Sequence, residues 1–257
     1  MAKVSIAGLE HAGARDELAG CEVRSGTITA LFDRPADPIH VHVLELSTDG
    51  RATFQTGEVD RVAYVWHGTA QVGAISLPQG SSIILERHAG SRIDAGADGA
   101  QIVLFAASRP SSGERRGGNV HLLPAERVPR YASANELSGG LHADSACPTC
   151  SAWLHENRFP PLTETTPQAA EAGIHSHTEN EVIFVADGQI RLGAKLLGPG
   201  TAVAIAADTM YSFTSGPEGL HFLNFRAEQP RDILFKNGHV MDEVGYWRDQ
   251  VPAPTYC

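Results

Sequence analysis

Three side chains of the kinds that bind metal ions lie close together in the stretch HSHTENEVIFVADG, residues 175–188. His175 and His177 are two residues apart, and alternate residues of a β-strand point to the same face. Glu181 opens the apolar run that follows, where a neighbouring strand can bring its carboxylate to the same place. Two imidazoles and one carboxylate leave positions open on a divalent Fe, Mn, Ni, Zn or Cu ion. The pattern therefore predicts a metal site that can also hold a small substrate or dioxygen.

The elements that must position these residues are short strands. Apolar runs separated by glycine and proline follow one another along the chain, as in an all-β sandwich or barrel. The runs are RVAYVW (61–66), SSIIL (81–85), AQIVLFAA (100–107), EVIFVA (181–186), TAVAIAA (201–207) and LHFLNF (220–225). Helical periodicity is weak, and we expect short helices only at residues 7–19 and 166–172.

The chain also contains an internal repeat. Residues 61–85 match residues 181–205 without a gap. The glycines that coincide include Gly68 with Gly188, Gly73 with Gly193 and Gly80 with Gly200. Glycines at fixed positions between strands indicate turns that need a positive φ or leave no room for a side chain. We therefore predict two copies of one β unit, arranged as tandem domains.

A change of composition separates the two copies. We expect the N-terminal copy at residues 1–111 and the C-terminal copy at residues 146–257. Residues 112–145 are rich in Ser, Gly, Arg and Pro, as linkers are. Within this linker, NVHLLP (119–124) is a candidate strand that crosses to the partner copy.

At these positions the sequence resembles the cupin superfamily. The first motif of that family reads H-x-H-x(3,4)-E-x6-G, and HSHTENEVIFVADG fits it at every fixed position. The second motif begins with a P-x-G turn, to which PGT at residues 199–201 is similar. The resemblance covers residues 35–110 and 145–230. It implies a bicupin, with two double-stranded β-helix (jelly-roll-like) barrels, a metal in the mouth of a barrel and small-molecule chemistry.

Tyr211 stands where the family carries a fourth metal ligand, a histidine. Three interpretations stay open. Tyr211 ligates the metal as a phenolate or hydrogen-bonds a bound water or substrate, which is our first choice. His221, in the run LHFLNF, completes the shell instead, or this copy binds metal weakly or not at all. Without such a role, Tyr211 is a half-buried tyrosine and His221 a strand histidine, each with a satisfied hydrogen bond.

The N-terminal copy lacks these ligands. The positions that match the four candidates hold Gln55, Gly57, Arg61 and Ser91. His40 and His42 are two residues apart, but they lie upstream of the motif's place and no glutamate follows at the right distance. We therefore predict a structural N-terminal copy. One divalent transition metal per chain (Fe, Mn, Ni or Zn) is expected, in the C-terminal copy.

The stretch WLHENRF, residues 153–159, is the strand expected just before the HxH strand. Alternate residues such as Trp153 and His155, or their neighbours, would face the barrel. His155 and Arg158 are therefore weaker candidates for holding an anionic substrate.

Cys147 and Cys150 form a lone C-x2-C. A structural zinc site needs a second pair of ligands, and a thioredoxin-type site needs a strand-to-helix context. Cys257 or His155 could join the pair. We predict instead a turn with two ordinary thiols, reduced in a cytoplasmic protein.

Composition and charge narrow the range of partners. A formal net charge of −10 over 257 residues argues against a nucleic-acid partner. No apolar run is long enough for a transmembrane helix, and the N-terminus lacks the apolar segment of a signal peptide. We expect a cytoplasmic protein with a small-molecule substrate and no membrane partner, and a homodimer is a further expectation.

The motif supports two classes of function. The first is a metal-dependent enzyme acting on a small organic molecule, with a dioxygenase-type oxidoreductase as first choice and an isomerase or lyase as the alternative. His175, His177 and Glu181 would hold the ion, and Tyr211 would donate a proton or hydrogen bond to developing charge. The second is a non-catalytic sensor that binds a small molecule in the same pocket. Ligands show where a metal lies and not what it does.

Overall fold

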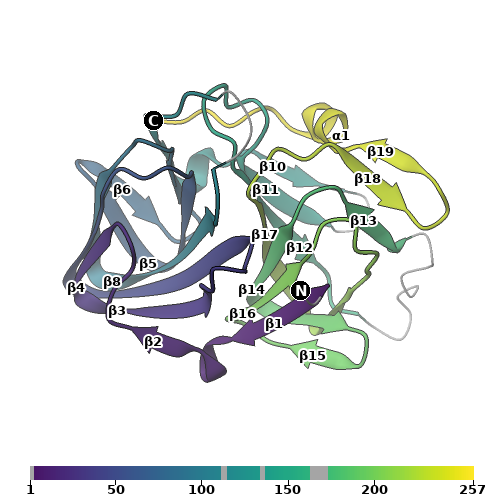
Figure 1. The fold of residues 1–257 in the computed structure, drawn as a ribbon, viewed down its shortest axis with the longest axis horizontal. Coiled ribbons are helices and arrows are strands. Elements are labelled where there is room, and N and C mark those ends of the chain that lie inside the picture. The colour runs from purple at the N-terminus through teal and green to yellow at the C-terminus, as the bar shows by residue number, and fades with distance from the viewer. Residues whose placement is uncertain (1–2, 111–114, 134–136, 163–172) are drawn as a thin grey trace.

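The computed structural model describes residues 3–110, 115–133, 137–162 and 173–257. Strands dominate it, and they form two large antiparallel sheets and one small sheet (Figure 1). We name the part built on the first sheet the N-terminal unit. Its strands are β2 (Gly13–Arg15), β3 (Cys21–Phe32), β4 (Ile39–Phe54), β5 (Arg61–Val72), β6 (Ile75–Pro78), β7 (Ser82–Leu85), β8 (Ser91–Ala107) and β9 (Val120–Leu123).

The C-terminal unit is built on the second large sheet and carries the small sheet at one end. The large sheet contains β1 (Val4–Gly8), β10 (Arg130–Ala132), β11 (Ser138–Ala143), β12 (Trp153–Phe159), β14 (Glu181–Leu192), β15 (Lys195–Leu197), β16 (Thr201–Ile205) and β17 (Thr214–Arg226). The small sheet contains β13 (His175–His177), β18 (Asp232–Phe235) and β19 (Val240–Asp242). The all-β fold predicted from the sequence is confirmed.

The apolar run of β14 is unbroken because both faces of this strand are buried. Its residues alternate between two buried faces, because successive side chains of a strand point to opposite sides of the sheet. Val182 and Phe184 pack in the core between the two units. Ile183 and Val185 pack in the separate core inside the C-terminal unit. Glu181 shares the inner face with this second pair, so its carboxylate points into the C-terminal unit.

The core between the two units joins them closely. The Trp66 indole Nε1 donates a hydrogen bond to the Ala186 carbonyl oxygen at 2.9 Å. Its ring meets the Phe184 ring edge-on, with centroids 5.0 Å apart. Phe105 stacks on Phe225 at a centroid distance of 5.1 Å. The two sheets therefore share one hydrophobic core.

The turn glycines of the two units adopt matching conformations, as the repeat predicts. Gly68 has φ +72° and Gly188 has φ +66°. A Cβ at either glycine would collide with the carbonyl oxygen of a second turn glycine, Gly99 or Gly219. Each of these two positions therefore requires glycine for its backbone conformation and for space.

The two ends of the chain cross between the units. β1 pairs with β16, so the first strand of the chain extends the C-terminal sheet (Figure 1). At the other end, Cys257 exchanges backbone hydrogen bonds with Leu122 of β9. β9 itself pairs with β7 in the N-terminal unit. The linker strand that we expected to cross therefore stays with the first unit, and the N-terminal strand crosses instead.

Helices are few in the described residues. η1 (Leu9–His11) and η2 (Ala125–Arg127) are single 3-10 turns, and α1 (Glu243–Gln250) is an α-helix that the sequence analysis did not predict. The helix expected at residues 7–19 is wrong, because β1, η1 and β2 occupy that range. The one expected at 166–172 lies outside the described residues. None of the helices in the described part of the chain has both the length and the apolar composition that crossing a bilayer demands.

Candidate metal and substrate site

His175 and His177 lie on β13 with their rings 5.0 Å apart between centroids, so the HxH spacing brings them together. His175 Nδ1 lies 2.9 Å from the Gly173 carbonyl oxygen, which can only accept a hydrogen bond. The proton of the neutral ring therefore lies on Nδ1, and Nε2 keeps its lone pair. The Tyr211 hydroxyl lies 3.2 Å from this Nε2 and also forms a hydrogen bond with the Glu181 carboxylate. Burial lowers the pKa of His175, which favours the neutral, ligating form.

Glu181 is the first residue of β14 and is 1% exposed. Its Oε2 accepts a hydrogen bond from Asn224 Nδ2 at 2.9 Å and lies 3.8 Å from His177 Nε2. Its Oε1 accepts no hydrogen bond of normal geometry. Burial alone would raise the pKa of Glu181, but His177 and Arg226 lower it overall. The site therefore holds an ionised carboxylate that contacts Asn224 and the Tyr211 hydroxyl.

Arg226 is a residue of this site that the sequence analysis did not identify. It ends β17 directly opposite Glu181 in the sheet. Its Nε lies 3.7 Å from Glu181 Oε2, and its Nη2 lies 3.3 Å from His177 Nε2. Burial would lower the pKa of Arg226, but Glu243 and Glu181 raise it, so the guanidinium stays charged.

Glu243 is the second missed residue, and it comes from outside the large sheet. It is the first residue of α1, and its Oε2 accepts a hydrogen bond from Arg226 Nη1. The same oxygen lies 3.3 Å from His177 Nδ1. Burial would raise the pKa of Glu243, but Arg226 and His177 lower it overall. Glu243 is therefore a buried carboxylate held by a buried arginine.

The residues fit a divalent ion in chemistry and charge. Two imidazoles, a buried carboxylate and a phenol are available. Arg226 brings one positive charge, whereas Glu181 and Glu243 bring two negative charges, which leaves the site at −1. His175, His177 and Glu181 do not have all their donor atoms within 4.8 Å of one another, so ion binding requires them to draw closer.

The two candidates for the fourth position lie on different faces. Tyr211 forms an isolated bridge with His175 and packs in the core inside the C-terminal unit. His221 lies on the opposite face of β17 from Arg226, because the two residues are separated by an odd number of positions. Its Nε2 lies 3.1 Å from the Glu156 carboxylate. The structure therefore brings Tyr211 to the motif and leaves His221 outside it.

His155 and Arg158 separate in the same way. His155 lies inside the C-terminal unit, between the rings of Trp153 and Trp247. Burial lowers the pKa of His155 well below its usual value, so the imidazole is neutral. Arg158 lies on the outer face of β12, 2.8 Å from the Glu156 carboxylate. Only His155 of this pair is near Arg226 and Glu243.

In the N-terminal unit a guanidinium takes the place of the glutamate. Arg61 opens β5, and its Nη2 donates to the carbonyl oxygens of Gln55 at 2.6 Å and Ala89 at 3.1 Å. Gly57 and Ser91, the other positions compared with the motif, offer no metal-ligating side chain of the usual kinds. His42 lies 3.2 Å from Asp33, and His40 lies beside it.

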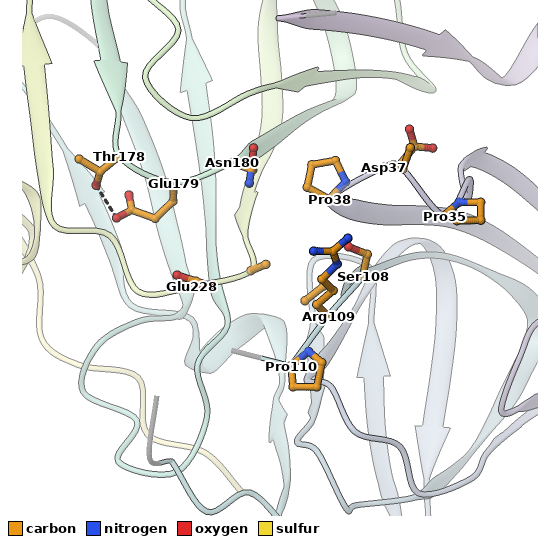
Figure 2. A pocket seen from close by; sticks show the side chains of 13 residues that line it. Pro35, Asp37, Pro38, Ser108, Arg109, Pro110, Thr178, Glu179, Asn180 and Glu228 are labelled. Atoms are coloured by element: carbon orange, nitrogen blue, oxygen red, sulfur yellow. Dashed lines mark hydrogen bonds between the residues drawn. The ribbon is translucent and has the colours of Figure 1, made fainter. Parts of the chain in front are cut away.

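A cavity of about 370 Å³ lies between the units next to the motif. Figure 2 shows the loop between His177 and Glu181 on one side of it and residues of the N-terminal unit on the other. The labelled residues of the two sides include Thr178, Glu179 and Asn180, and Pro38, Ser108 and Arg109. Burial raises the pKa of Glu179, whose side chain accepts a hydrogen bond from Thr178. The cavity reaches the loop that carries the motif, from the side of the N-terminal unit.

No protein-family model matches the chain, and no curated protein matches it in sequence. Solved structures do. Protein Ylba from E. coli is 16% identical with a TM-score of 0.62, over 87% of this chain and 90% of that chain. A variant of the oxalate decarboxylase from Bacillus subtilis is 12% identical with a TM-score of 0.65, over 90% and 79%. A putative glyoxylate-induced protein from Pseudomonas aeruginosa is 11% identical with a TM-score of 0.63, over 88% and 89%.

Identities this low show the fold alone. The chain therefore has a cupin fold, and the resemblance predicted from the HxH motif is supported at that level.

Proposed function

We propose that this chain is a metal-dependent enzyme that acts on a small organic carboxylate in the C-terminal unit. The observation that carries the proposal is Arg226, a buried arginine beside His177 and Glu181 that already holds the carboxylate of Glu243. Arginine binds carboxylates through several directed hydrogen bonds, and it keeps its charge when buried.

The charge of the site supports an anionic substrate. The charges of Arg226, Glu181 and Glu243, the three side chains counted in this site, sum to −1. A divalent ion brings this sum to +1, and the sum becomes +2 when the substrate takes the place of Glu243, so a substrate with two carboxylates returns it to zero. Buried charges are stable only when they are compensated in this way. A neutral substrate would leave the loaded site with an uncompensated positive charge.

Glu243 marks the position that the substrate carboxylate would take. It approaches Arg226 from α1, a separate element that follows the small sheet. A substrate carboxylate that displaces Glu243 would keep the hydrogen bond to Arg226 and would place the rest of the molecule toward His177, 3.3 Å from the present carboxylate oxygen.

Tyr211 is the proton donor of the proposed site. Burial raises the pKa of Tyr211 well above its ordinary value, so the phenol is protonated at neutral pH. Its hydroxyl lies 3.2 Å from His175 Nε2 and points into the group of candidate ligands. A bound metal ion would polarise an oxygen of the substrate as a Lewis acid. Tyr211 would then give a hydrogen bond or a proton to the charge that develops beside it.

A lyase or an isomerase is the class of reaction that this arrangement supports best, because a carboxylate anchor lies beside a proton donor. One similar structure is an oxalate decarboxylase, whose substrate is also a carboxylate. The dioxygenase reaction predicted from the motif requires the same ligands plus dioxygen, and it stays a prediction. The same assay distinguishes the two reaction classes.

The test is a substrate screen on metal-loaded protein. Small 2-oxo acids, 2-hydroxy acids and dicarboxylates are incubated with protein loaded with Fe, Mn, Ni or Zn, with and without oxygen, and products are followed by NMR. We expect turnover of a carboxylate without oxygen, and loss of at least 100-fold in kcat/KM in Arg226→Gln, as expected when a buried charge-assisted contact of about 3 kcal/mol is removed.

Two variants serve as controls. Arg226→Lys keeps the charge and should retain part of the activity. Arg24→Gln removes a surface arginine that contacts Glu22 at 2.8 Å, and it should change nothing. Turnover of uncharged compounds that is unaffected by Arg226→Gln would refute the carboxylate assignment. Oxygen consumption during turnover would favour the dioxygenase instead.

A further inference from the structure

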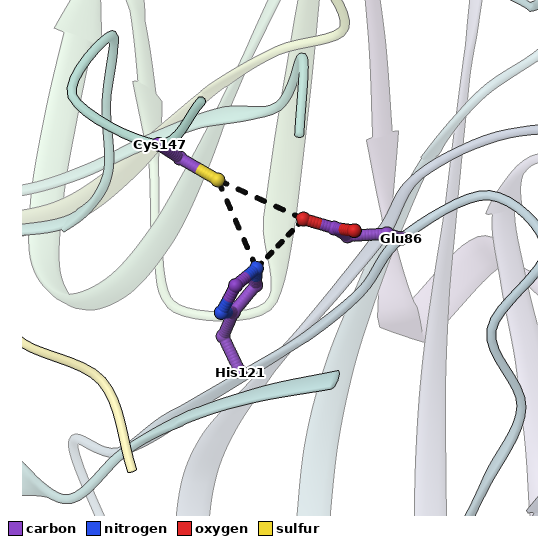
Figure 3. A group of neighbouring side chains, drawn as sticks. All are labelled: Glu86, His121 and Cys147. Carbon is purple, nitrogen blue, oxygen red and sulfur yellow. Dashed lines mark hydrogen bonds and ion pairs between the residues drawn. The ribbon is translucent and has the colours of Figure 1, made fainter. Parts of the chain in front are cut away.

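A second group of metal-ligating side chains lies where the two units meet. Glu86 follows β7, His121 lies on β9, and Cys147 lies in the segment between β11 and β12 (Figure 3). One donor atom from each lies within 4.8 Å of the other two. His121 Nε2 is 2.7 Å from Glu86 Oε1 and 3.8 Å from Cys147 Sγ, and that sulfur is 3.7 Å from Glu86 Oε1.

The three donor atoms converge on one point rather than forming a chain. In a nucleophile–histidine–acid triad, the two ring nitrogens contact different partners. Here the same nitrogen, His121 Nε2, faces both the sulfur of Cys147 and the oxygen of Glu86. This geometry does not suit a proton relay, and it does suit three ligands around a common ion.

Neighbouring groups hold each ligand in place. Glu86 is fully buried, and its second oxygen, Oε2, accepts hydrogen bonds from Asn119 N at 2.8 Å and Asn119 Nδ2 at 3.0 Å. Oε1 is turned toward His121 and also accepts a hydrogen bond from the Thr149 hydroxyl at 2.5 Å. Cys147 Sγ accepts the backbone N–H of Cys150 at 3.2 Å, a contact that favours a thiolate. Outer contacts of this kind orient ligands in metal sites.

The charges of the group agree with its geometry. Hydrogen bonding with Cys150 and with His121 lowers the pKa of Cys147 to about 3, against the opposing effect of burial. Hydrogen bonds with Cys147 and Glu86 raise the pKa of His121 to about 9. Without an ion, the imidazole is thus the cation between two anionic groups. A divalent ion at the same place would displace the proton and compensate both anions.

We propose that Glu86, His121 and Cys147 bind a zinc ion that joins the C-terminal unit to the sheet of the N-terminal unit. Thiolate and imidazole ligands select zinc among the common divalent ions, because alkaline-earth ions prefer oxygen. The three ligands come from both sides of the boundary between the units, so the role of the ion is structural.

This proposal departs from the prediction that Cys147 and Cys150 are ordinary thiols of a turn. Both are free and buried in the structure, as expected for reduced cysteines. Neither Cys257 nor His155 supplies the partner, since His121 and Glu86 do. The partners of Cys147 are not its neighbours in the sequence. Glu86 follows β7 and His121 lies on β9, and the fold brings both beside Cys147.

The experiment measures zinc binding in a background without the motif of the C-terminal unit. Full-length His175→Ala/His177→Ala protein is stripped with a chelator and titrated with zinc against a chromophoric competitor. We expect one zinc per chain. Cys147→Ser in this background should weaken binding at least 100-fold, because a three-ligand site loses one of its ligands. Zinc should also raise the melting temperature of the background protein and not that of the Cys147→Ser variant.

Cobalt provides a direct readout of the sulfur ligand. Bound cobalt should show thiolate-to-metal charge-transfer absorption in the background protein, and this band should disappear with Cys147→Ser. Cys21→Ser, which changes another buried thiol, is the matched control and should keep the band. Should Cys147→Ser unfold, His121→Gln takes its place.

Zinc binding that Cys147→Ser and His121→Gln leave unchanged would overturn the proposal. A background protein that binds no zinc would do the same. Both outcomes leave the proposed site at Arg226 untouched, because that site is tested by turnover of a carboxylate.

Discussion

Glu243 offers a sharp test of how the C-terminal site is held together. Its carboxylate accepts from Arg226 Nη1 through Oε2 and from Trp247 Nε1 through Oε1, the latter at 3.4 Å. The substitution Glu243→Gln keeps the size of the side chain and an acceptor oxygen, but it removes the charge. Arg226 then has only Glu181 as an anionic partner, with 3.7 Å between Nε and Oε2.

The expected cost follows from burial. Breaking a buried ion pair by removing one partner costs about 3–5 kcal/mol, because the other charge stays buried without compensation. Glu181 compensates part of the charge of Arg226, so we expect the lower end, about 3 kcal/mol. Glu218→Gln, which changes an exposed glutamate, should cost less than about 0.5 kcal/mol.

The cost should depend on pH in a defined direction. Arg226 and His177 hold the pKa of Glu243 below its ordinary value, although burial opposes them. A carboxylate with a lowered pKa contributes stability above its unfolded pKa, about 4.3, and the contribution is lost as the pH falls through the folded pKa. The difference between wild type and Glu243→Gln is therefore complete at pH 7 and shrinks progressively once the pH falls below about 5, so it is already smaller at pH 4.

The assay is urea unfolding of metal-free protein at pH 7 and at pH 4. Tryptophan fluorescence reports on Trp247, which lies in α1 with Glu243. The single variants Glu243→Gln and Arg226→Met and their double variant form a thermodynamic cycle. We expect a coupling energy of more than about 1 kcal/mol. Additive effects in this cycle, or a cost of Glu243→Gln that is the same at pH 4 and pH 7, would refute the ion-pair reasoning.

Three further predictions concern single side chains. Tyr211→Phe should lower turnover by roughly ten- to ten-thousand-fold with metal content kept, whereas loss of metal from this variant would make the phenol a ligand. Gly188→Ala should destabilise by about 3 kcal/mol or more in thermal unfolding, because the new Cβ meets the Gly219 carbonyl; Gly193→Ala, with open space, should cost only about 1–2 kcal/mol of left-handed strain. Burial keeps the pKa of His155 low, so wild type loses up to about 1.4 kcal/mol of stability per pH unit as the pH falls below about 6.5; His155→Phe should remove that slope, and an unchanged slope would place the effect elsewhere.

The repeat could be predicted from the sequence because its physical cause is local. A turn with a positive φ strongly favours glycine at that residue, because glycine adopts this conformation without steric cost. Gly73 and Gly193 both have φ +59°, and Gly80 and Gly200 have +86° and +79°. The closeness of His175 and His177 is equally local, since residues two positions apart in a strand share a face.

Arg226 and Glu243 escaped prediction for a different reason. His221 in β17 was the alternative to Tyr211 because of its residue type, and the alternation of the strand places it on the other face. Asn224 and Arg226 share one face of β17, and it is this face that meets Glu181. Glu243 is farther from any pattern, because α1 is short and only its position in the folded chain brings it to Arg226.

The group of Glu86, His121 and Cys147 has no local sequence pattern. Its members come from three elements, and each is an unremarkable residue beside its neighbours in the chain. In the sequence, only the lone C-x2-C indicates a metal site here. The partners of Cys147 come from the N-terminal unit, where Glu86 follows β7 and His121 lies on β9. Long-range pairing of strands, which spacing cannot reveal, decides which side chains meet.

The N-terminal unit has Arg61 at the position of the metal-binding glutamate, yet it supports the site in the C-terminal unit. The Ser151 backbone N–H donates to Asp60 Oδ2 at 2.5 Å, and Arg115 Nη1 donates to the Cys150 carbonyl at 2.8 Å. These contacts fix the chain just before β12 begins at Trp153. Trp153 lies opposite Arg226 in the sheet.

A zinc ion on Cys147 would act on the same short segment. The segment between Cys147 and Trp153 is held by the contacts of Cys150 and Ser151 with Arg115 and Asp60, so an ion on Cys147 would add to the restraint on the start of β12. The position of β12 in turn sets where His155 lies beside Glu243 and Arg226. A structural ion between the units would therefore restrict the site inside the C-terminal unit, and the two sites would be coupled through β12 rather than through direct contact. The N-terminal unit, which lacks the motif, would then support the site of the C-terminal unit through β12 and through the core that the two units share.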